Sequence, residues 1–275
     1  MKTLLYVLLM PCLSFGQNVD IPDENFKTYL VGNSTINTNN DDEIQVNEAA
    51  AYSGWLNCQA LGISDLTGVE AFTSVSVILC GGNELTELDL SQNTALTQLS
   101  CWNNQLTSLD ISQNTSLFRL VCYDNQLTSL DISQNTDLAE LNCENNQITS
   151  IDVSQNTELT YLTCQNNQLT YLNVANGNNV QMGAIQTFNA SNNPNLNCIE
   201  VDNLNWSNSN WTASEGHIDT HHYFSENCNE TEIEEYLSNK NLVKTTDILG
   251  RRHTNKSFQL HIYDDGSVEK KYIIK

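Results

Sequence analysis

Three consecutive segments of the chain have nearly the same sequence. Residues 101–121 read CWNNQLTSLDISQNTSLFRLV, residues 122–142 read CYDNQLTSLDISQNTDLAELN, and residues 143–163 read CENNQITSIDVSQNTELTYLT. A cysteine opens each segment, and Cys80 and Cys164 extend the same 21-residue spacing on either side. A fixed period of about 20 to 50 residues predicts a repeat architecture, in which each unit packs against its neighbours along the chain.

Each unit contains a short alternation of apolar residues that predicts a β-strand. Leu120 and Cys122 face one side of such a strand, whereas Arg119, Val121 and Tyr123 face the other. One strand cannot bury its apolar side alone, but stacked copies can form a parallel sheet with strands about 4.8 Å apart. The predicted core ladder consists of Leu99, Leu120, Leu141 and Leu162 beside the cysteines, with Leu106, Leu127, Ile148 and Leu169 behind them.

An asparagine follows each predicted strand, where the backbone must turn: Asn104, Asn125, Asn146 and Asn167. A buried amide can pair N–H and C=O groups that would each cost roughly 1–3 kcal/mol if they were buried unpaired. The whole pattern, L-x-x-L-x-C-x-x-N-x-L, resembles the leucine-rich repeat with cysteine in its third apolar place. The resemblance implies an α/β-type solenoid dominated by β: a right-handed leucine-rich repeat with about seven parallel strands, an N-terminal helical cap and a small all-β C-terminal tail domain.

The ladder cysteines are expected to be core residues. Neighbouring in-register side chains lie about one strand spacing apart, which is wider than the roughly 3.8 Å between Cβ atoms that a disulfide needs. No C-x-x-C spacing typical of a zinc site occurs among them. Free cysteine packs as a small hydrophobic residue, and the same role is expected here.

Residues 1–16 have the features of a secretory signal peptide, with one lysine, an apolar run and small residues near the end. The run is too short to span a membrane as a helix, and no other stretch is long and apolar enough. The pattern therefore predicts an exported chain, secreted or at the cell surface.

Residues 17–52 are predicted to form a helical cap over the open end of the first coil, and they contain a loop with calcium-binding spacing. Oxygen-bearing side chains stand at places one, three, five, seven and twelve of this loop: Asn37, Asn39, Asp41, Glu43 and Glu48. With Ile44 at place eight, this spacing matches the EF-hand calcium loop. Asparagine at the first place and Asp42 in place of glycine depart from that pattern. An ordinary polar turn is the competing interpretation, so calcium is the one cofactor that the sequence suggests.

The predicted solenoid spans residues 53–193, and residues 194–229 are predicted to form a C-terminal cap. That cap holds Cys198 and Cys228, the two cysteines beyond the predicted signal peptide that lie off the ladder. In an exported protein they are expected to form a disulfide, which would contribute roughly 3 kcal/mol. His217, Asp219, His221 and His222 could form a metal cluster, but a polar loop is the favoured interpretation.

Charge divides the chain into an acidic body and a basic tail. Residues 18–239 hold 29 acidic residues and only Lys27 and Arg119 as bases, whereas residues 240–275 hold eight bases and four acids. The acidic body argues against nucleic acid as a partner. The tail also predicts three strands, in LVKTTDIL, FQLHIY and SVEKKYII, with an Asp264-Asp265-Gly266 turn between the last two.

The tail, residues 230–275, resembles the C-terminal sorting domain of proteins exported by the type IX secretion system of Bacteroidetes. The matching segments are LVKTTDILGRR and IYDDGSVEKKYIIK. The resemblance implies transport across the outer membrane through that machinery. The residues that match the sorting motif are Asp247, Gly250, Arg251, Asp265, Gly266, Glu269 and Lys270.

No catalytic motif stands out, and a binding function is predicted instead. The sequence has no G-x-S-x-G, H-E-x-x-H, phosphate-binding loop or dinucleotide fingerprint, and no histidine precedes residue 217.

One aspartate recurs in each coil, as Asp89, Asp110, Asp131 and Asp152. These aspartates are expected to be structural, with the repulsion between their carboxylates reduced by hydrogen bonds to the backbone or to nearby serines.

The outward positions of the strands vary while the core around them does not. They include exposed tryptophan, tyrosine and arginine, the residue types that anchor interfaces. The sequence therefore predicts a module that binds a protein or glycan on its concave strand face. The alternative is a passive surface spacer, whose threonine row (Thr107, Thr128, Thr149 and Thr170) faces water. The predicted binding residues are Trp55, Leu79, Trp102, Arg119, Val121, Tyr123, Glu140, Glu144 and Tyr161.

Overall fold

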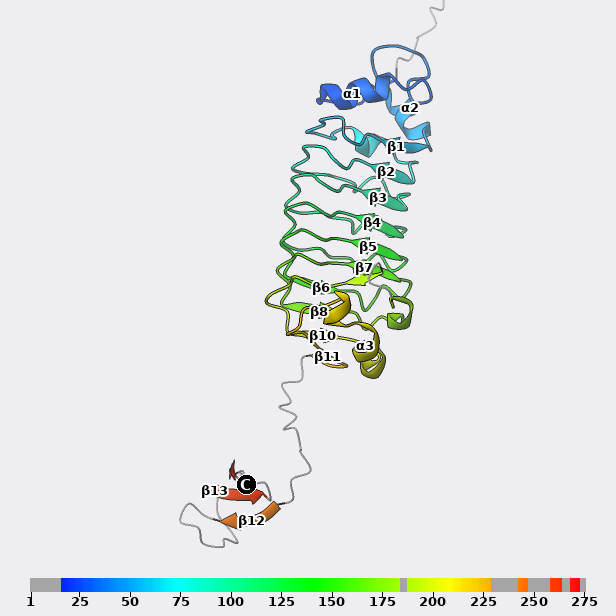
Figure 1. Cartoon of the computed structure of the whole chain (residues 1–275). Coiled ribbons are helices and arrows are strands. Elements are labelled where there is room, and N and C mark those ends of the chain that lie inside the picture. Colours follow the sequence, from blue (N-terminus) through cyan, green and yellow to red (C-terminus); the bar gives the residue numbers. More distant parts are fainter. Residues whose placement is uncertain (1–15, 184–186, 229–241, 247–257, 264–267, 273–275) are drawn as a thin grey trace, which may run out of the picture. The chain divides into compact units, whose positions relative to one another are not determined.

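The computed structural model describes residues 16–183, 187–228, 242–246, 258–263 and 268–272 of the 275-residue chain. The chain divides into two compact units, Met1–Cys228 and Asn229–Lys275. In the first unit, successive coils stack on one another so that one short strand of each coil joins a seven-stranded parallel sheet (Figure 1). Its strands, in spatial order, are β1 (Trp55–Asn57), β2 (Val77–Leu79), β3 (Gln98–Ser100), β4 (Arg119–Val121), β5 (Glu140–Asn142), β7 (Tyr161–Thr163) and β9 (Phe188–Asn189).

The register of this sheet aligns the same repeat position in every coil. Leu99 pairs with Leu120, and Leu120 pairs with Leu141 in turn. These central residues are buried, and so are all six ladder cysteines, which remain free thiols. Burial raises the pKa of the Cys122 and Cys164 thiols to about 12, so they stay protonated and unreactive at neutral pH. The predicted solenoid, its seven strands and the core role of the ladder cysteines are confirmed.

The asparagine ladder connects each coil to the one before it. The backbone N–H of Leu106 donates to Oδ1 of Asn125 (3.0 Å), while Nδ2 of Asn125 donates to the carbonyls of Cys101 (3.0 Å) and Cys122 (3.2 Å). Asn104, Asn146, Asn167 and Asn193 make the equivalent bonds. Each amide therefore satisfies buried backbone groups of two coils at once, as the spacing predicted.

The residue just before each ladder asparagine adopts a left-handed backbone. Its φ is 49° at Asn103, 53° at Asp124 and 53° at Asn145, and Gly82 has 70° at the same place. Asparagine, aspartate and glycine tolerate this conformation better than other residues do. The left-handed turn after each strand therefore explains why the place before each ladder asparagine holds only glycine, asparagine or aspartate, from Gly82 to Asn192.

A second asparagine ladder, which was not predicted from the sequence, lies in the S-Q-N segment of each coil. Asn93, Asn114, Asn135 and Asn156 are fully buried. Nδ2 of Asn135 donates to the carbonyl of Asn114 (2.8 Å), and Nδ2 of Asn156 donates to that of Asn135 (2.7 Å). The signal was available, because an asparagine recurs there every 21 residues between polar neighbours.

A second parallel sheet forms near the end of the stack and was also not predicted. It consists of β6 (Ser150–Asp152), β8 (Tyr171–Asn173), β10 (Cys198–Glu200) and β11 (Tyr223–Ser225). The coils thus continue past residue 193 into the segment expected as a cap, which also contains α3 (Leu204–Asn210). Three short 3-10 helices complete the unit: η1 (Val69–Ala71), η2 (Asn179–Gln181) and η3 (Ala213–Glu215).

Helices α1 (Glu24–Val31) and α2 (Val46–Ala51) lie at the β1 end of the stack (Figure 1). Asp23 caps α1 by accepting the N–H groups of Asn25 and Phe26, both at 2.9 Å. Its other oxygen accepts the N–H of Ser64 in the first coil (2.9 Å). Phe26 and Leu30 point into the core that includes Leu56. One carboxylate therefore both starts the helix and attaches it to the solenoid.

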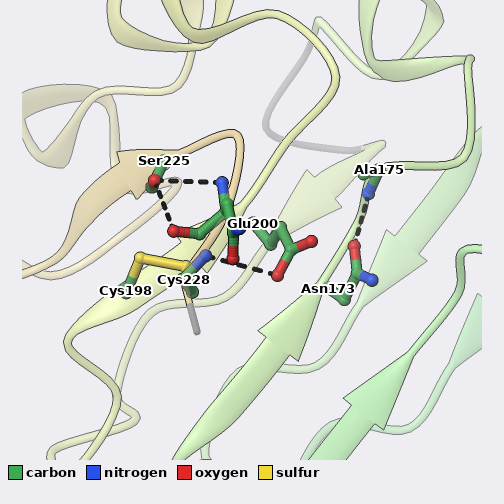
Figure 2. The surroundings of a disulfide bond; sticks show 7 residues. Asn173, Ala175, Cys198, Glu200, Ser225 and Cys228 are labelled. Carbon is green, nitrogen blue, oxygen red and sulfur yellow. Dashed lines mark hydrogen bonds between the residues drawn. A yellow bond between two sulfur atoms is a disulfide. The ribbon is translucent and has the colours of Figure 1, made fainter. Parts of the chain in front are cut away.

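The predicted disulfide joins Cys198 of β10 to Cys228, with a Cα–Cα distance of 5.9 Å (Figure 2). The backbone N–H of Cys228 also donates to Oε2 of Glu200 (3.4 Å). The bond closes a loop with a sequence separation of 30 residues that includes α3 and β11. By the loop-entropy model, such a closure contributes about 3–4 kcal/mol to the stability of this end.

The recurring aspartates are relieved by the backbone. Oδ1 of Asp89, Asp110, Asp131 and Asp152 accepts the N–H of the serine two residues later, each at 2.9 Å. For Asp110, this bond from Ser112 lowers the pKa of the carboxyl below its usual value. The structural interpretation of this ladder is confirmed.

In the second unit, β12 (Leu242–Thr246), β13 (Phe258–Tyr263) and β14 (Val268–Tyr272) form an antiparallel sheet, which confirms the three predicted strands. The register of β12 shifts between Leu242 and Lys244. Within the described residues, no helix is both long and apolar enough to span a bilayer. The predicted signal peptide lies outside the described residues, except for Gly16.

We predict that Asn125→Ala lowers the free energy of unfolding by about 2–4 kcal/mol, because it leaves the Leu106 N–H and at least one buried carbonyl unpaired. Gln126→Ala is the matched control, since Gln126 is the exposed neighbour of Asn125 in the same turn. Urea unfolding followed by circular dichroism measures both variants. Equal stability of the two variants would contradict the role assigned to the ladder.

Candidate functional site

The candidate site lies on the strand face, defined here as the outward surface of β1–β5, β7 and β9. Because side chains alternate along a strand, the first and third residues of each strand point outward while the second is buried. All nine predicted binding residues lie on this face, either within a strand or directly after a ladder cysteine. Their place on this face follows from the alternation of side chains along each strand.

A column of side chains runs across this face at the position after each ladder cysteine. The rings of Trp102 and Tyr123, on adjacent coils, stack with centroids 5.6 Å apart and planes 10° from parallel. On the other side of Trp102 lies Gly81, where any Cβ atom would collide with Nε1 of the indole. Glycine at that place therefore makes the room that the indole occupies.

The column changes from aromatic to polar beyond Tyr123. Glu144 follows Tyr123, and Nε2 of Gln165 on the next coil donates to its Oε2. Burial, and then the nearby charge of Asp124, raises the pKa of the Glu144 carboxyl above its usual value. One stripe of the face thus offers a pair of rings next to a half-buried carboxylate and amide.

Beside this column, the face is hollowed by a groove of about 560 Å³ over β2 to β7. Polar groups in the groove also come from Gln98, Ser100 and Asn142. Each is the first or third residue of its strand, so its side chain points outward. Trp55, 63% exposed on β1, and Glu144 do not line the groove. Seven of the nine predicted residues do line it: Leu79, Trp102, Arg119, Val121, Tyr123, Glu140 and Tyr161.

Within the groove, Arg119 and Glu140 form an ion pair between adjacent strands, with Nε and Oε2 2.9 Å apart. Both side chains are about half exposed, at 49% and 43%. An exposed pair of this kind contributes about 0–1 kcal/mol to stability. Arg119 therefore does pair with the next coil, and it also remains accessible at the surface of the groove.

Other predicted sites lie elsewhere. Asn37, Asn39, Asp41 and Glu43 of the predicted calcium loop lie between α1 and α2, and Glu48 lies in α2. The Glu43 carboxylate pairs with Lys27 at 2.8 Å. Among the predicted sorting residues, Asp247, Gly250, Arg251, Asp265 and Gly266 lie outside the described residues. Glu269 and Lys270 lie in β14.

The histidine-rich segment forms a hydrogen-bonded end to the asparagine ladder. Asp219 accepts the N–H groups of Asn192 (2.9 Å) and Asn193 (3.0 Å), and its own N–H donates to Nδ1 of His222 (3.3 Å). Nε2 of His222 lies 3.3 Å from the carbonyl of Asn193 and 3.4 Å from Oδ2 of Asp219. Both ring nitrogens of His222 are thus engaged within the protein.

In the described part of the chain, one group of three His, Cys, Asp or Glu residues has its potential metal-ligand atoms within 4.8 Å of one another. It consists of Asp219, His221 and His222. His217 stands apart from them, with Nδ1 3.8 Å from Glu215. For Nε2 of His222 to bind a metal, Nδ1 would have to carry the proton and would then face the N–H of Asp219. The hydrogen bonds therefore favour the structural loop over a metal cluster.

No protein-family model matches the chain. A segment of 73 residues, 26% of the chain, is 38% identical to internalin J of Listeria monocytogenes, and it corresponds to 8% of that protein's length. The solved functional domain of InlJ from the same species, described as including a cysteine ladder, is 26% identical with a TM-score of 0.33, over 69% of this chain and 58% of that one. An internalin C2 from this species is 21% identical with a TM-score of 0.48, over 66% and 74% of the two chains.

The 21-residue period, the in-register leucines and cysteines and the asparagine ladder define the fold as a parallel β-solenoid of the leucine-rich repeat type. The buried positions are nearly the same in every coil, whereas the outward positions of the strand face differ from coil to coil.

We predict that acid weakens the end of the stack through His222. Burial lowers the pKa of this imidazole below its ordinary value of 6.5, against the opposing effects of the Asn193 carbonyl and the Asp219 charge. The folded state therefore favours the neutral ring, so its contribution to stability is complete above about pH 6.5 and is lost as pH falls below that value. Melting of wild type and His222→Gln between pH 7.5 and about 5 tests this. The same pH slope in both proteins would contradict the assignment.

Proposed function

We propose that this chain is a secreted or cell-surface binding module that holds a protein or glycan partner in the groove of the strand face. The single observation that carries the proposal is the stacked Trp102–Tyr123 pair beside a groove of about 560 Å³. Large aromatic side chains, together with arginine, are the residues in which binding energy concentrates. Both rings lie near the middle of the seven-stranded sheet, where a partner would cover them most completely.

The contrast between constant and variable positions supports binding. Core leucines, cysteines and asparagines repeat from coil to coil because each must fit an identical neighbour above and below. The position after the cysteine escapes this constraint, and it holds glycine, tryptophan, tyrosine, glutamate and glutamine in succession from Gly81 to Gln165. Glycine at position 81 is the one residue that leaves room for the indole of Trp102.

The groove is less suited to catalysis. The residues that line it include no histidine or cysteine, and Glu140 is their one carboxylate, already paired with Arg119. A general acid–base pair or an activated nucleophile needs a second group within hydrogen-bonding distance. We therefore propose recognition without chemical conversion.

A passive spacer is the second candidate, and a specific observation favours it. Trp102 stacks on Tyr123, and Arg119 pairs with Glu140, so both contacts also tie adjacent coils together. In a spacer these side chains would serve stability alone, and the exposed threonines of the coils would have no specific role.

Replacing both rings distinguishes the two candidates. Trp102→Ala with Tyr123→Ala should abolish partner binding, because central aromatic residues each contribute about 2 kcal/mol or more. The free energy of unfolding should fall by only about 1 kcal/mol, which is the usual contribution of a stacked aromatic pair. Thr107→Ala with Thr128→Ala is the matched control, since these threonines are exposed on the same two coils.

Pull-downs from the natural surroundings and a glycan array measure binding, and thermal melts measure folding. A partner captured by wild type and the threonine variant but not by the aromatic variant supports the groove. Equal capture by all three folded proteins, or by none, would favour the spacer.

We further propose that the chain is exported and that residues 230–275 direct it through type IX secretion machinery. The support is the signal-like segment 1–16 and the resemblance of the tail. In a host with that machinery, deletion of residues 230–275 should retain the protein inside the outer membrane, while the full chain reaches the medium or the surface. Equal release of both forms would overturn this proposal.

A further inference from the structure

The segment of residues 37–48, called the loop here, follows α1 and includes the first turn of α2. It has no part in the proposed function, yet it gathers oxygen atoms. It holds four carboxylates, Asp41, Asp42, Glu43 and Glu48, without histidine or cysteine. Lys27 is the nearest base in the sequence, and it is occupied by Glu43. Oxygen-only surroundings with excess negative charge suit a hard cation rather than a transition metal.

Asn37, the first residue of this loop, has a buried oxygen without a partner. The residue is 3% exposed, and its Nδ2 donates to the carbonyls of Asp41 (2.7 Å) and Val31 (3.1 Å). This orientation is fixed, because a flipped amide would turn its oxygen against two carbonyls. Oδ1 of Asn37 then has no hydrogen-bond donor. A buried oxygen left unpaired costs about 1–3 kcal/mol. Oδ1 of Asn93, Asn114, Asn135 and Asn156 is also buried without a partner, but Asn37 differs because it lies in a segment with four carboxylates.

Two carboxylates of the segment, those of Asp41 and Glu48, accept hydrogen bonds within it. Asp41 accepts the N–H of Glu43 (2.8 Å) through Oδ1, while Nδ2 of Asn39 (2.8 Å) and Nε2 of Gln45 (3.1 Å) donate to its Oδ2. Glu48 folds back over ten residues, so that its Oε1 accepts both the N–H (2.8 Å) and the hydroxyl (2.7 Å) of Thr38.

The Glu48 carboxylate is buried and accepts hydrogen bonds from Thr38, Asn39 and Gln45. Its Oε2 accepts a single bond, from the N–H of Gln45 (3.1 Å), and keeps a lone pair. A buried carboxylate with spare acceptor capacity therefore lies in the same segment as the unpartnered oxygen of Asn37.

We propose that the loop binds one calcium ion through Asn37, Asn39, Asp41, Glu48 and the main-chain carbonyl of Glu43. The Glu43 side chain is not needed as a ligand, which is consistent with its ion pair to Lys27. The ion fixes the connection between α1 and α2, whose residues Ile36 and Ile44 are fully buried. Because asparagine replaces a carboxylate at the first place, the affinity falls in the weak range of extracellular modules, about 0.1–1 mM.

Calorimetry and thermal melting of the full chain, after treatment with EDTA, test the site with calcium chloride. Wild type should bind one ion with a Kd of about 0.1–1 mM and melt at a higher temperature when calcium is added. Asp41→Asn and Asn37→Ala should each weaken binding at least about tenfold, since each removes a ligand. Asp42→Asn is the matched control, because it removes the same charge from the adjacent exposed residue.

Three outcomes would overturn the proposal. The first is the absence of heat and of a melting shift at about 10 mM calcium, ten times the upper end of the expected range. The second is equal weakening by Asp42→Asn and Asp41→Asn, which would indicate diffuse attraction to an acidic loop. The third is unchanged binding by folded Asn37→Ala, which would indicate that a buried water is the partner of that oxygen. Circular dichroism shows that each variant is folded before it is titrated.

Discussion

The structure depends on hydrogen bonds between the buried backbone groups of each coil and the side-chain amide of an asparagine in the next coil. A short strand and a tight turn leave buried N–H and C=O groups that no local partner can reach. Asn125 satisfies such groups in two coils, and its equivalents do the same along the stack. Because the amide must meet the same groups every time, the coils can stack only in one register. The identical core residues and the 21-residue period follow from that constraint.

The same constraint explains where variation is tolerated. Leu120 and Cys122 pack between identical neighbours, so a change at either position would disturb three coils. Side chains on the strand face meet their neighbours only at the surface, where a glycine, an indole and a phenol can follow one another. A solenoid therefore separates its stability from its recognition surface: the buried ladders hold the coils together, and the outward column is free to acquire a partner.

The two ends of the array require different solutions, because their coils lack a neighbour on one side. At the start, Asp23 attaches α1 to Ser64, and Glu48 organises the loop between the helices. At the other end, Asp219 takes over the backbone groups after Asn192, and the Cys198–Cys228 disulfide closes the last coils. Both ends use buried or half-buried charge, so the ends, rather than the uniform middle, are where pH and ions are expected to act.

The sequence by itself determined the repeat, the core and the side of the sheet on which each residue lies, because these follow from a strict period and from strand alternation. It placed Trp102 and Tyr123 on adjacent strands, and it paired Cys198 with Cys228. It did not predict the second sheet: the T-S-L-D segment at Thr107–Asp110 forms no strand, whereas Ser150–Asp152 does so because β8 lies beside it. Three further features depend on distances between separate coils and loops. They are the set of side chains that enclose the groove, the room that Gly81 leaves for the indole, and the burial of the Asn37 oxygen without a partner. Only the tertiary structure fixes those distances, since they arise from packing and not from the local pattern.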